Sequence, residues 1–278
     1  MNELNCEKID NLLRLALDED IGTGDITTIA CVPEDAVSGG RFIAKEPGVI
    51  SGLSVLKRVF ELMDKSVNVT TLVSDGDAVS DGDVIATISG PSQAILTGER
   101  TALNLLQHMS AIATRTAEAV REISSTKAKI LDTRKTTPGL RALEKYAVTC
   151  GGGTNHRFNL ADGVLIKDNH IKAAGGITNA VKKVQPSPQN HKIEVETETL
   201  EQVKEALNAG ADIIMLDNMA PALMAEAVKL INGRALTEAS GNMGERDLKT
   251  IAETGVDYIS IGALTHSVKA MDISLKFD

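Results

Sequence analysis

Residues 193–217 read IEVETETLEQVKEALNAGADIIMLD, two short apolar runs separated by a helical segment. Strands that alternate with helices pair in parallel and form βαβ units. Each apolar run is followed at once, or ended, by an acid, Glu196 in the first case and Asp217 in the second. The stretch therefore predicts a parallel sheet that carries polar side chains at the carboxyl ends of its strands.

The same pattern recurs six times after residue 124. Polar residues or glycines mark the ends of all six runs, at intervals of 21 to 35 residues, which is typical of a (β/α) barrel. Six strands predict an incomplete barrel, or one closed on one side by a long helix. A doubly wound open sheet is the rival, but its polar residues would gather at one switch point. The predicted strands are 130–131, 164–166, 193–195, 213–216, 235–239 and 258–261, and their ends are Asp132, Lys167, Glu196, Asp217, Ser240 and Gly262.

The first 124 residues predict a mixed α/β region. Helices are expected near 12–17 and 55–63, strands at 41–44, 67–73 and 84–89, and a long helix over 91–124 with Gly98 as a candidate break. Two Asp-Gly pairs in SDGDAVSDGDVIATISG (74–90) predict hairpin turns. They are similar to the turns of lipoyl and biotinyl carriers, but they contain no lysine to modify. A structural, hammerhead-like sheet is the better interpretation.

Composition narrows the class of protein. The 278 residues are 42% hydrophobic and 24% charged, which favours a folded α/β protein of one large or two modest domains. Only 2% are aromatic and the net charge is −9, so nucleic acid and anionic membranes are not expected as partners. No run suits a membrane helix, and the first ten residues lack the apolar core of a secretory signal. Cys6, Cys31 and Cys150 form no close pair, which predicts free thiols in a reducing cytoplasm.

Cationic side chains are concentrated between residues 134 and 167. This segment holds six basic and two acidic residues, a net charge of +4, although a solvated basic loop would give the same count. If the strand ends meet, a group of cations faces one cavity and requires a multiply charged anion between its members. The group is Arg134, Lys135, His156, Arg157 and Lys167.

Two further groups of residues would meet the same cavity. Glu196 and Asp217 suit Mg²⁺ or sugar hydroxyls, and the segments 240–242 and 262–263 suit a phosphate held by backbone amides. The triplet Gly151–Gly153 allows close backbone approach before His156. A thiol nucleophile at Cys150 is disfavoured because no orienting partner is evident. These residues predict an enzyme that binds a phosphorylated sugar and a second anion together with Mg²⁺.

Longer motifs carry a resemblance to a known family. DTRKTTPGLR (132–141), GGGTNHR (151–157) and LIKDNHI (165–171) closely resemble quinolinate phosphoribosyltransferases. The similarity extends over nearly the whole chain, and no charged site position departs from it. The other matching segments are EDIGTGDITT (19–28), GERTALNLLQHMSAIAT (98–114), EKYAV (144–148), EVETETLEQ (194–202), IIMLDNM (213–219), EASGN (238–242) and ISIGALTHS (259–267).

The resemblance implies an architecture and an assembly. It implies an N-terminal α/β sandwich domain over 1–110, an incomplete α/β barrel over 111–266, and a tail, 267–278, that returns to the first domain. It also implies a homodimer or larger homo-oligomer in which the neighbouring subunit completes each active site.

The resemblance also implies an activity. Quinolinate and phosphoribosyl pyrophosphate give nicotinate mononucleotide, pyrophosphate and CO₂ in NAD biosynthesis, with Mg²⁺ as cofactor. Lys135, Lys167, Glu196 and Asp217 are implied as catalytic, and Glu196 and Asp217 as holding Mg²⁺ directly or indirectly. Arg100, donated across the dimer, and Arg134, His156 and Arg157 are implied as partners of the quinolinate carboxylates. The remaining implied substrate-binding residues are Thr133, Ser240, Gly241, Asn242, Ser260, Gly262 and His266.

Three alternatives stay open at this point. A nicotinate-type phosphoribosyltransferase would bind one fewer carboxylate and need fewer arginines. A molybdenum-transport homologue shares the same fold. A non-catalytic binder would not need both acids and both lysines, so the crowded charged set favours the enzyme.

Overall fold

The computed structural model describes residue 4 and residues 9–186 and 191–278, and Cys6 lies outside them. The chain divides into two compact units. Unit 1 comprises residues 1–117, 137–152 and 267–278, and unit 2 comprises 118–136 and 153–266. This division differs from the predicted one because 111–117 and 137–152 belong to unit 1. The second of these segments contains helix α5 (Arg141–Cys150), whose residues Leu143, Ala147 and Val148 lie in the core of unit 1.

Unit 1 is built on a four-stranded sheet in the order β12–β1–β5–β3, in which every neighbouring pair is antiparallel. The C-terminal strand β12 pairs along β1, placing Leu275 opposite Phe42. Phe42 packs against Phe60 of α3, with ring centroids 6.1 Å apart. The strands are β1 (Val37–Ala44), β3 (Asn68–Thr71), β5 (Val84–Pro91) and β12 (Ile273–Phe277), and the first helices are α1 (Asp10–Ile21), α2 (Ile26–Cys31) and α3 (Leu53–Met63).

The two Asp-Gly pairs do not form the predicted hairpins. Between them lies β4 (Ala78–Val79), which pairs with β2 (Gly48–Val49) and not with β3 or β5. The Asp77 and Asp83 carboxylates each accept a hydrogen bond from a backbone amide three residues earlier, Ser74 and Ser80. These local bonds fix two separate turns, so the prediction of adjacent paired strands was wrong.

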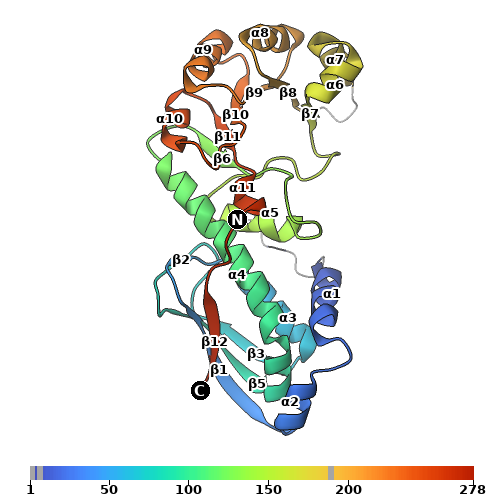
Figure 1. Ribbon diagram of the computed structural model, residues 1–278, viewed down its shortest axis with the longest axis vertical. Helices are drawn as coiled ribbons and strands as arrows, with labels where there is room; N and C mark the ends of the chain where they lie inside the picture. The colour runs from blue at the N-terminus through green and yellow to red at the C-terminus, as the bar shows by residue number, and fades with distance from the viewer. Residues whose placement is uncertain (1–3, 5–8, 187–190) are drawn as a thin grey trace. The chain divides into compact units, whose positions relative to one another are not determined.

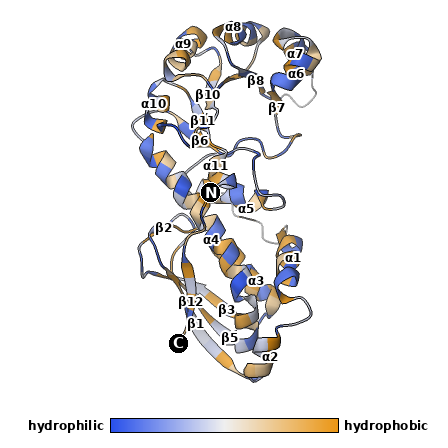
Figure 2. Cartoon of the chain, in the orientation of Figure 1, coloured by the Kyte–Doolittle hydropathy of each residue, from blue (hydrophilic) through white to orange (hydrophobic). Residues whose placement is uncertain are grey.

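Helix α4 (Ser92–Glu122) is 31 residues long and continues without a break through Gly98. A side chain at Gly98 would come within 3.1 Å of Met63 and 3.2 Å of Phe60. The glycine therefore allows close packing of α4 on α3 and does not end the helix. Figure 2 shows hydrophobic and hydrophilic residues alternating along α4, and its buried side includes Leu103, Leu106 and Met109.

Unit 2 contains six parallel strands in the order β6–β11–β10–β9–β8–β7. Strands β7 to β11 follow chain order without reversal, and helices α6 to α9 lie along one side of them (Figure 1). The sheet therefore has no switch point, and β6 and β7 remain as its edges, as expected of an incomplete barrel. The strands are β6 (Lys129–Leu131), β7 (Val164–Ile166), β8 (Ile193–Thr197), β9 (Ile213–Asp217), β10 (Leu236–Ser240) and β11 (Tyr258–Ser260).

Residues that favour helix ends flank helices of unit 2. Thr199 caps α8 by accepting a hydrogen bond from the Gln202 amide, and Gly210 ends it in the left-handed conformation. Asp247 caps α10 in the same way as Thr199. The helices are α6 (Asp168–Ala174), α7 (Ile177–Val184), α8 (Leu200–Ala209), α9 (Pro221–Ile231), α10 (Leu248–Glu253) and α11 (Ala263–His266). Within the described residues, none of the helices is long and apolar enough to cross a membrane.

The glycine after α5 is a packing residue of unit 1. A Cβ at Gly151 would collide with the backbone carbonyl of Ala113 and lie 2.6 Å from Thr116. We expect Gly151→Ala to lower the free energy of unfolding by about 1–3 kcal/mol, because overpacking against backbone cannot be relieved by a rotamer change. Urea denaturation followed by circular dichroism measures it.

Gly39→Ala is the matched control for this substitution. Its Cβ would meet only ordinary contacts, 3.5 Å or more, in β1. We expect a change within about 0.5 kcal/mol for the control. Equal stability of the Gly151→Ala and Gly39→Ala chains would contradict the packing role.

Candidate active site

A cavity of about 580 Å³ lies in unit 2 at the carboxyl ends of the strands. It brings together most of the residues that the sequence predicted, although β6, β7, β8, β9, β10 and β11 are separated widely along the chain. The predicted residues that line it are Thr133, Arg134, Lys135, His156, Arg157, Lys167, Glu196, Asp217, Ser240, Gly241, Asn242 and Ser260.

Three predicted residues are not among the described residues that line this cavity. Arg100 is an exposed residue of α4 in unit 1. Gly262 and His266 adjoin the cavity through Lys135: a Cβ at Gly262 would lie 3.0 Å from Lys135 Cδ and 3.2 Å from His266 Nε2. The absence of a side chain at Gly262 leaves room for Lys135.

The segment that carries His156 and Arg157 lies beside the edge strand β6. Thr154 donates its amide to the Ile130 carbonyl at 2.8 Å and forms a parallel bridge with Leu131. The Arg157 guanidinium donates to the Gly163 carbonyl, just before β7, at 2.8 Å. Residues 154–157 are thereby bonded at one end to β6 and at the other to the entrance of β7. This segment brings two further site residues to a barrel with only six strands.

Cations form one wall of the cavity. Burial lowers the pKa of Arg157, and the charge of nearby Arg134 lowers it further. The Arg157 Nε atom is buried and has no hydrogen-bond partner among the described residues. Lys135 is exposed, and its carbonyl accepts a hydrogen bond from the Thr265 hydroxyl at 2.7 Å. A wall with two adjacent guanidinium groups favours a ligand with more than one negative charge.

Two carboxylates, Glu196 and Asp217, also line the cavity. Burial and the charge of Asp217 raise the pKa of Glu196, while Lys167 acts in the other direction. The Lys167 Nζ atom is 3.9 Å from Glu196 Oε2. Two carboxylates close enough to repel each other, with one exposed lysine beside them, fit a divalent cation or the hydroxyl groups of a sugar.

The turn after β10 has an uncommon backbone. Gly241 has φ of 95° and Asn242 has φ of 52°, and Asn218 after β9 has φ of 54°. A Cβ at Gly241 would overlap the Asn218 side chain, whose amide donates to Asp217 Oδ2 at 2.7 Å. Only glycine at 241 therefore permits the two turns to lie against each other beside Asp217.

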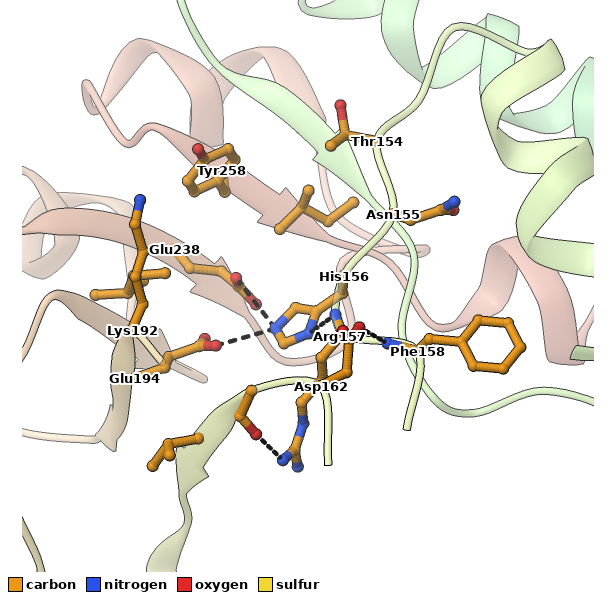
Figure 3. A pocket seen from close by; sticks show the side chains of 14 residues that line it. Thr154, Asn155, His156, Arg157, Phe158, Asp162, Lys192, Glu194, Glu238 and Tyr258 are labelled. Atoms are coloured by element: carbon orange, nitrogen blue, oxygen red, sulfur yellow. Dashed lines mark hydrogen bonds and ion pairs between the residues drawn. The ribbon is translucent and has the colours of Figure 1, made fainter. Parts of the chain in front are cut away.

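His156 lines this cavity, and its ring is directed toward two glutamates (Figure 3). Its Nε2 atom lies 3.1 Å from Glu194 Oε2 and 3.6 Å from Glu238 Oε2. Both glutamates are buried, and they line a second cavity of about 540 Å³ together with Lys192 and Tyr258. Burial and the neighbouring Glu194 carboxylate raise the pKa of Glu238, so Glu238 retains its proton more readily than an exposed glutamate.

Two family descriptions match almost the entire chain. "Quinolinate phosphoribosyl transferase, N-terminal domain" matches residues 25–110, and the corresponding C-terminal domain matches 112–276. The chain belongs to the quinolinate phosphoribosyltransferase family. It is 49% identical over 276 residues to a probable nicotinate-nucleotide pyrophosphorylase [carboxylating] of Bacillus subtilis, covering 99% of this chain and 94% of the relative. A chloroplastic relative from Arabidopsis thaliana is 47% identical, covering 96% and 82%.

Solved structures of the same family have the same fold. The nicotinate-nucleotide pyrophosphorylase of Francisella tularensis gives a TM-score of 0.95 at 42% identity, covering 100% of this chain and 98% of that one. The one from Ehrlichia chaffeensis gives a TM-score of 0.93 at 39% identity, with 100% of each chain covered. The family assignment therefore agrees with the resemblance that the motifs carry.

Five residues that lie around the site were not predicted from the sequence. Glu194 had an available signal, because it stands two positions before Glu196 in the same strand and alternate residues share a face. Cys150, weighed as a nucleophile, is buried in unit 1, and this burial raises the pKa of its thiol. Leu165, Met215, Asn218 and Glu238 line the cavity, and Glu194 lies behind His156.

The charges around Glu196 predict the direction of two pKa changes. Asp217→Asn should lower the pKa of Glu196 because it removes a neighbouring negative charge, and Lys167→Met should raise it because it removes a positive one. Carbon-13 NMR titration of the Glu196 carboxyl in metal-free buffer measures both. An unchanged pKa in both variants would contradict the arrangement of these three charges.

Proposed function

We propose that the larger of the two cavities described, at the carboxyl ends of the strands, is where this enzyme transfers the phosphoribosyl group of phosphoribosyl pyrophosphate to quinolinate. The products are nicotinate mononucleotide, pyrophosphate and CO₂. The observation that carries this proposal is that a group of cations and a pair of carboxylates line the same cavity. A dianionic acid fits the first, and a phosphorylated ribose fits the second.

Quinolinate binding is assigned to the arginine wall. Arg134 and Arg157 each offer a planar fork for a carboxylate, and their mutual repulsion is relieved when a dianion lies between them. Two anchored carboxylates would hold the pyridine nitrogen in line with the anomeric carbon of ribose. Nicotinate has one carboxylate and would satisfy only one of the two forks, which favours quinolinate.

The lysines and carboxylates serve the transfer step. The nitrogen lone pair forms the bond to the anomeric carbon, and the bond to pyrophosphate breaks with its electron pair on the departing oxygen. Lys135 and Lys167 stabilise the charge of the departing group, and Glu196 and Asp217 stabilise the positive charge that develops on the ribose. The same two acids would hold Mg²⁺, which when bound neutralises part of the pyrophosphate charge.

Decarboxylation follows from the transfer. The nitrogen becomes positively charged once it is bonded to ribose, and the adjacent carboxylate then leaves as CO₂. Its bonding electrons stay on the ring carbon, next to the cationic nitrogen, and a proton from solvent completes the product. No side chain is needed as a general base for the transfer, in agreement with the lack of a serine or cysteine triad in the described cavity.

A homodimer or larger homo-oligomer is part of the proposal. Unit 1 exposes the large apolar side chains Ile26, Ile29 and Val37, each at least 64% exposed. A second copy of the chain would remove such a surface from water. In this assembly Arg100 is the residue assigned to the quinolinate of the neighbouring subunit.

Incubation with phosphoribosyl pyrophosphate and Mg²⁺ tests the reaction directly. We expect nicotinate mononucleotide and one equivalent of CO₂ from quinolinate, and no nucleotide from nicotinate in parallel. Lys167→Ala should lower kcat by about 100-fold because it removes one of the groups that stabilise the departing charge. Turnover of nicotinate alone, or of neither acid, would contradict the proposal.

A mixed assembly tests the shared site. Arg100→Ala and Lys167→Ala chains, each with little activity alone, should recover about a quarter of the normal activity when unfolded together and refolded as a dimer, because one site in each mixed dimer is intact. Refolding each variant alone is the control. Activity that stays at the level of the separate variants would contradict an Arg100 donated by the partner.

A further inference from the structure

His156 uses both ring nitrogens within the protein. The Arg157 backbone amide donates to His156 Nδ1 at 2.7 Å, so Nδ1 presents a lone pair and the ring proton of a neutral histidine lies on Nε2. Nε2 in turn faces Glu194 Oε2 at 3.1 Å and Glu238 Oε2 at 3.6 Å. Figure 3 shows the ring between these carboxylates and the backbone of residue 157. In this arrangement neither nitrogen is available to a substrate carboxylate.

The backbone around the ring is fixed as well. The His156 amide donates to Asp132 Oδ1 at 2.8 Å, and Asp132 is fully buried at the end of β6. The side chain of the next residue, Arg157, is attached at its other end to the Gly163 carbonyl. The position of the Arg157 guanidinium therefore depends on the His156 ring, because the ring holds the amide from which Arg157 begins.

We propose that Glu194 and Glu238 are positioning residues, which hold the His156 ring so that it fixes Arg157 for the quinolinate carboxylate. The inference rests on the proposed function, since Arg157 is assigned there to quinolinate. It changes the role of His156 from a ligand of the substrate to a support for the residue that binds it.

The choice of carboxylates for this role has an electrostatic reason. A lone backbone carbonyl would suffice to accept one proton from Nε2. The negative charge of Glu194, however, also acts on Arg157 and opposes the repulsion between Arg157 and Arg134. Glu194 thus helps to keep two guanidinium groups close together before the dianion arrives.

A metal ion is the alternative occupant of this cluster. One ligand atom from each of His156, Glu194 and Glu238 lies within 4.8 Å of the others, as in a metal site. Coordination through Nε2 would place the ring proton on Nδ1. There it would face the Arg157 N–H, which already points at Nδ1, so two donors would meet without an acceptor. The hydrogen bonds therefore favour the positioning role.

The test compares two double variants with the wild-type chain. Glu194→Leu with Glu238→Leu removes both carboxylates that face Nε2, and apolar residues of similar volume are tolerated in place of buried charges. We expect the KM for quinolinate to rise about tenfold while the KM for phosphoribosyl pyrophosphate stays within about twofold. Glu194→Gln with Glu238→Gln keeps an acceptor for Nε2 but not the charge that acts on Arg157, so it should restore part of the affinity.

Thr237→Val is the control for a purely structural effect. Thr237 is buried on the same strand as Glu238 but bonds to Asp257 through its hydroxyl. The Thr237→Val substitution should lower the melting temperature without changing the KM for either substrate. Nitrogen-15 NMR of His156 gives a readout that does not need activity, and we expect the tautomer protonated at Nε2.

Four results would overturn the inference. The first two are equal changes in both KM values and no rescue by the double glutamine variant. The third is a His156 tautomer protonated at Nδ1. The fourth, from a metal analysis, is one equivalent of metal bound to the wild-type chain and lost from the double leucine variant. If the wild-type chain makes no nicotinate mononucleotide, the proposed function fails instead. The tautomer and metal measurements would then still decide how His156 is held.

Discussion

Repulsion between the cations at one end of a parallel sheet is the constraint on which the site depends. The sheet brings Arg134, Arg157 and Lys167 to the same edge because the carboxyl ends of parallel strands meet there. Such a group is stable only beside negative charge. Glu194 and Glu196 supply some of it, and in the proposed function a dianionic ligand in the cavity supplies the remainder. Structure and substrate choice thus have one physical origin.

Much of this arrangement could be predicted from the sequence, because the relevant signals are local and periodic. All six strands of unit 2 lie where the apolar runs placed them, and four of the six predicted strand ends, Lys167, Glu196, Asp217 and Ser240, line one cavity. Long motifs then identified the family, which spacing alone does not reveal. Gly262 and His266 adjoin the cavity through Lys135 without lining it, a distinction that depends on side-chain packing.

What the sequence did not predict depends on contacts between distant segments. Helix α5 lies between two strands of unit 2 in the chain yet packs into the core of unit 1, and no local pattern indicates that. The backbone at Gly151 packs closely against α4 and not against a ligand, which only the fold reveals. The Asp-Gly pairs predict turns correctly but not which strands pair across them. The family resemblance implied that His156 binds a quinolinate carboxylate, whereas its hydrogen bonds decide where it points.

The most direct test of the divided cavity is a crystal structure of the chain with phthalate. Phthalate has the two adjacent carboxylates of quinolinate but no ring nitrogen, so it binds without reacting. We predict that its carboxylates contact the guanidinium groups of Arg134 and Arg157, with the His156 ring still bonded to Glu194. Phthalate bound in the second cavity, or a carboxylate in contact with His156 Nε2, would contradict this assignment of the two cavities.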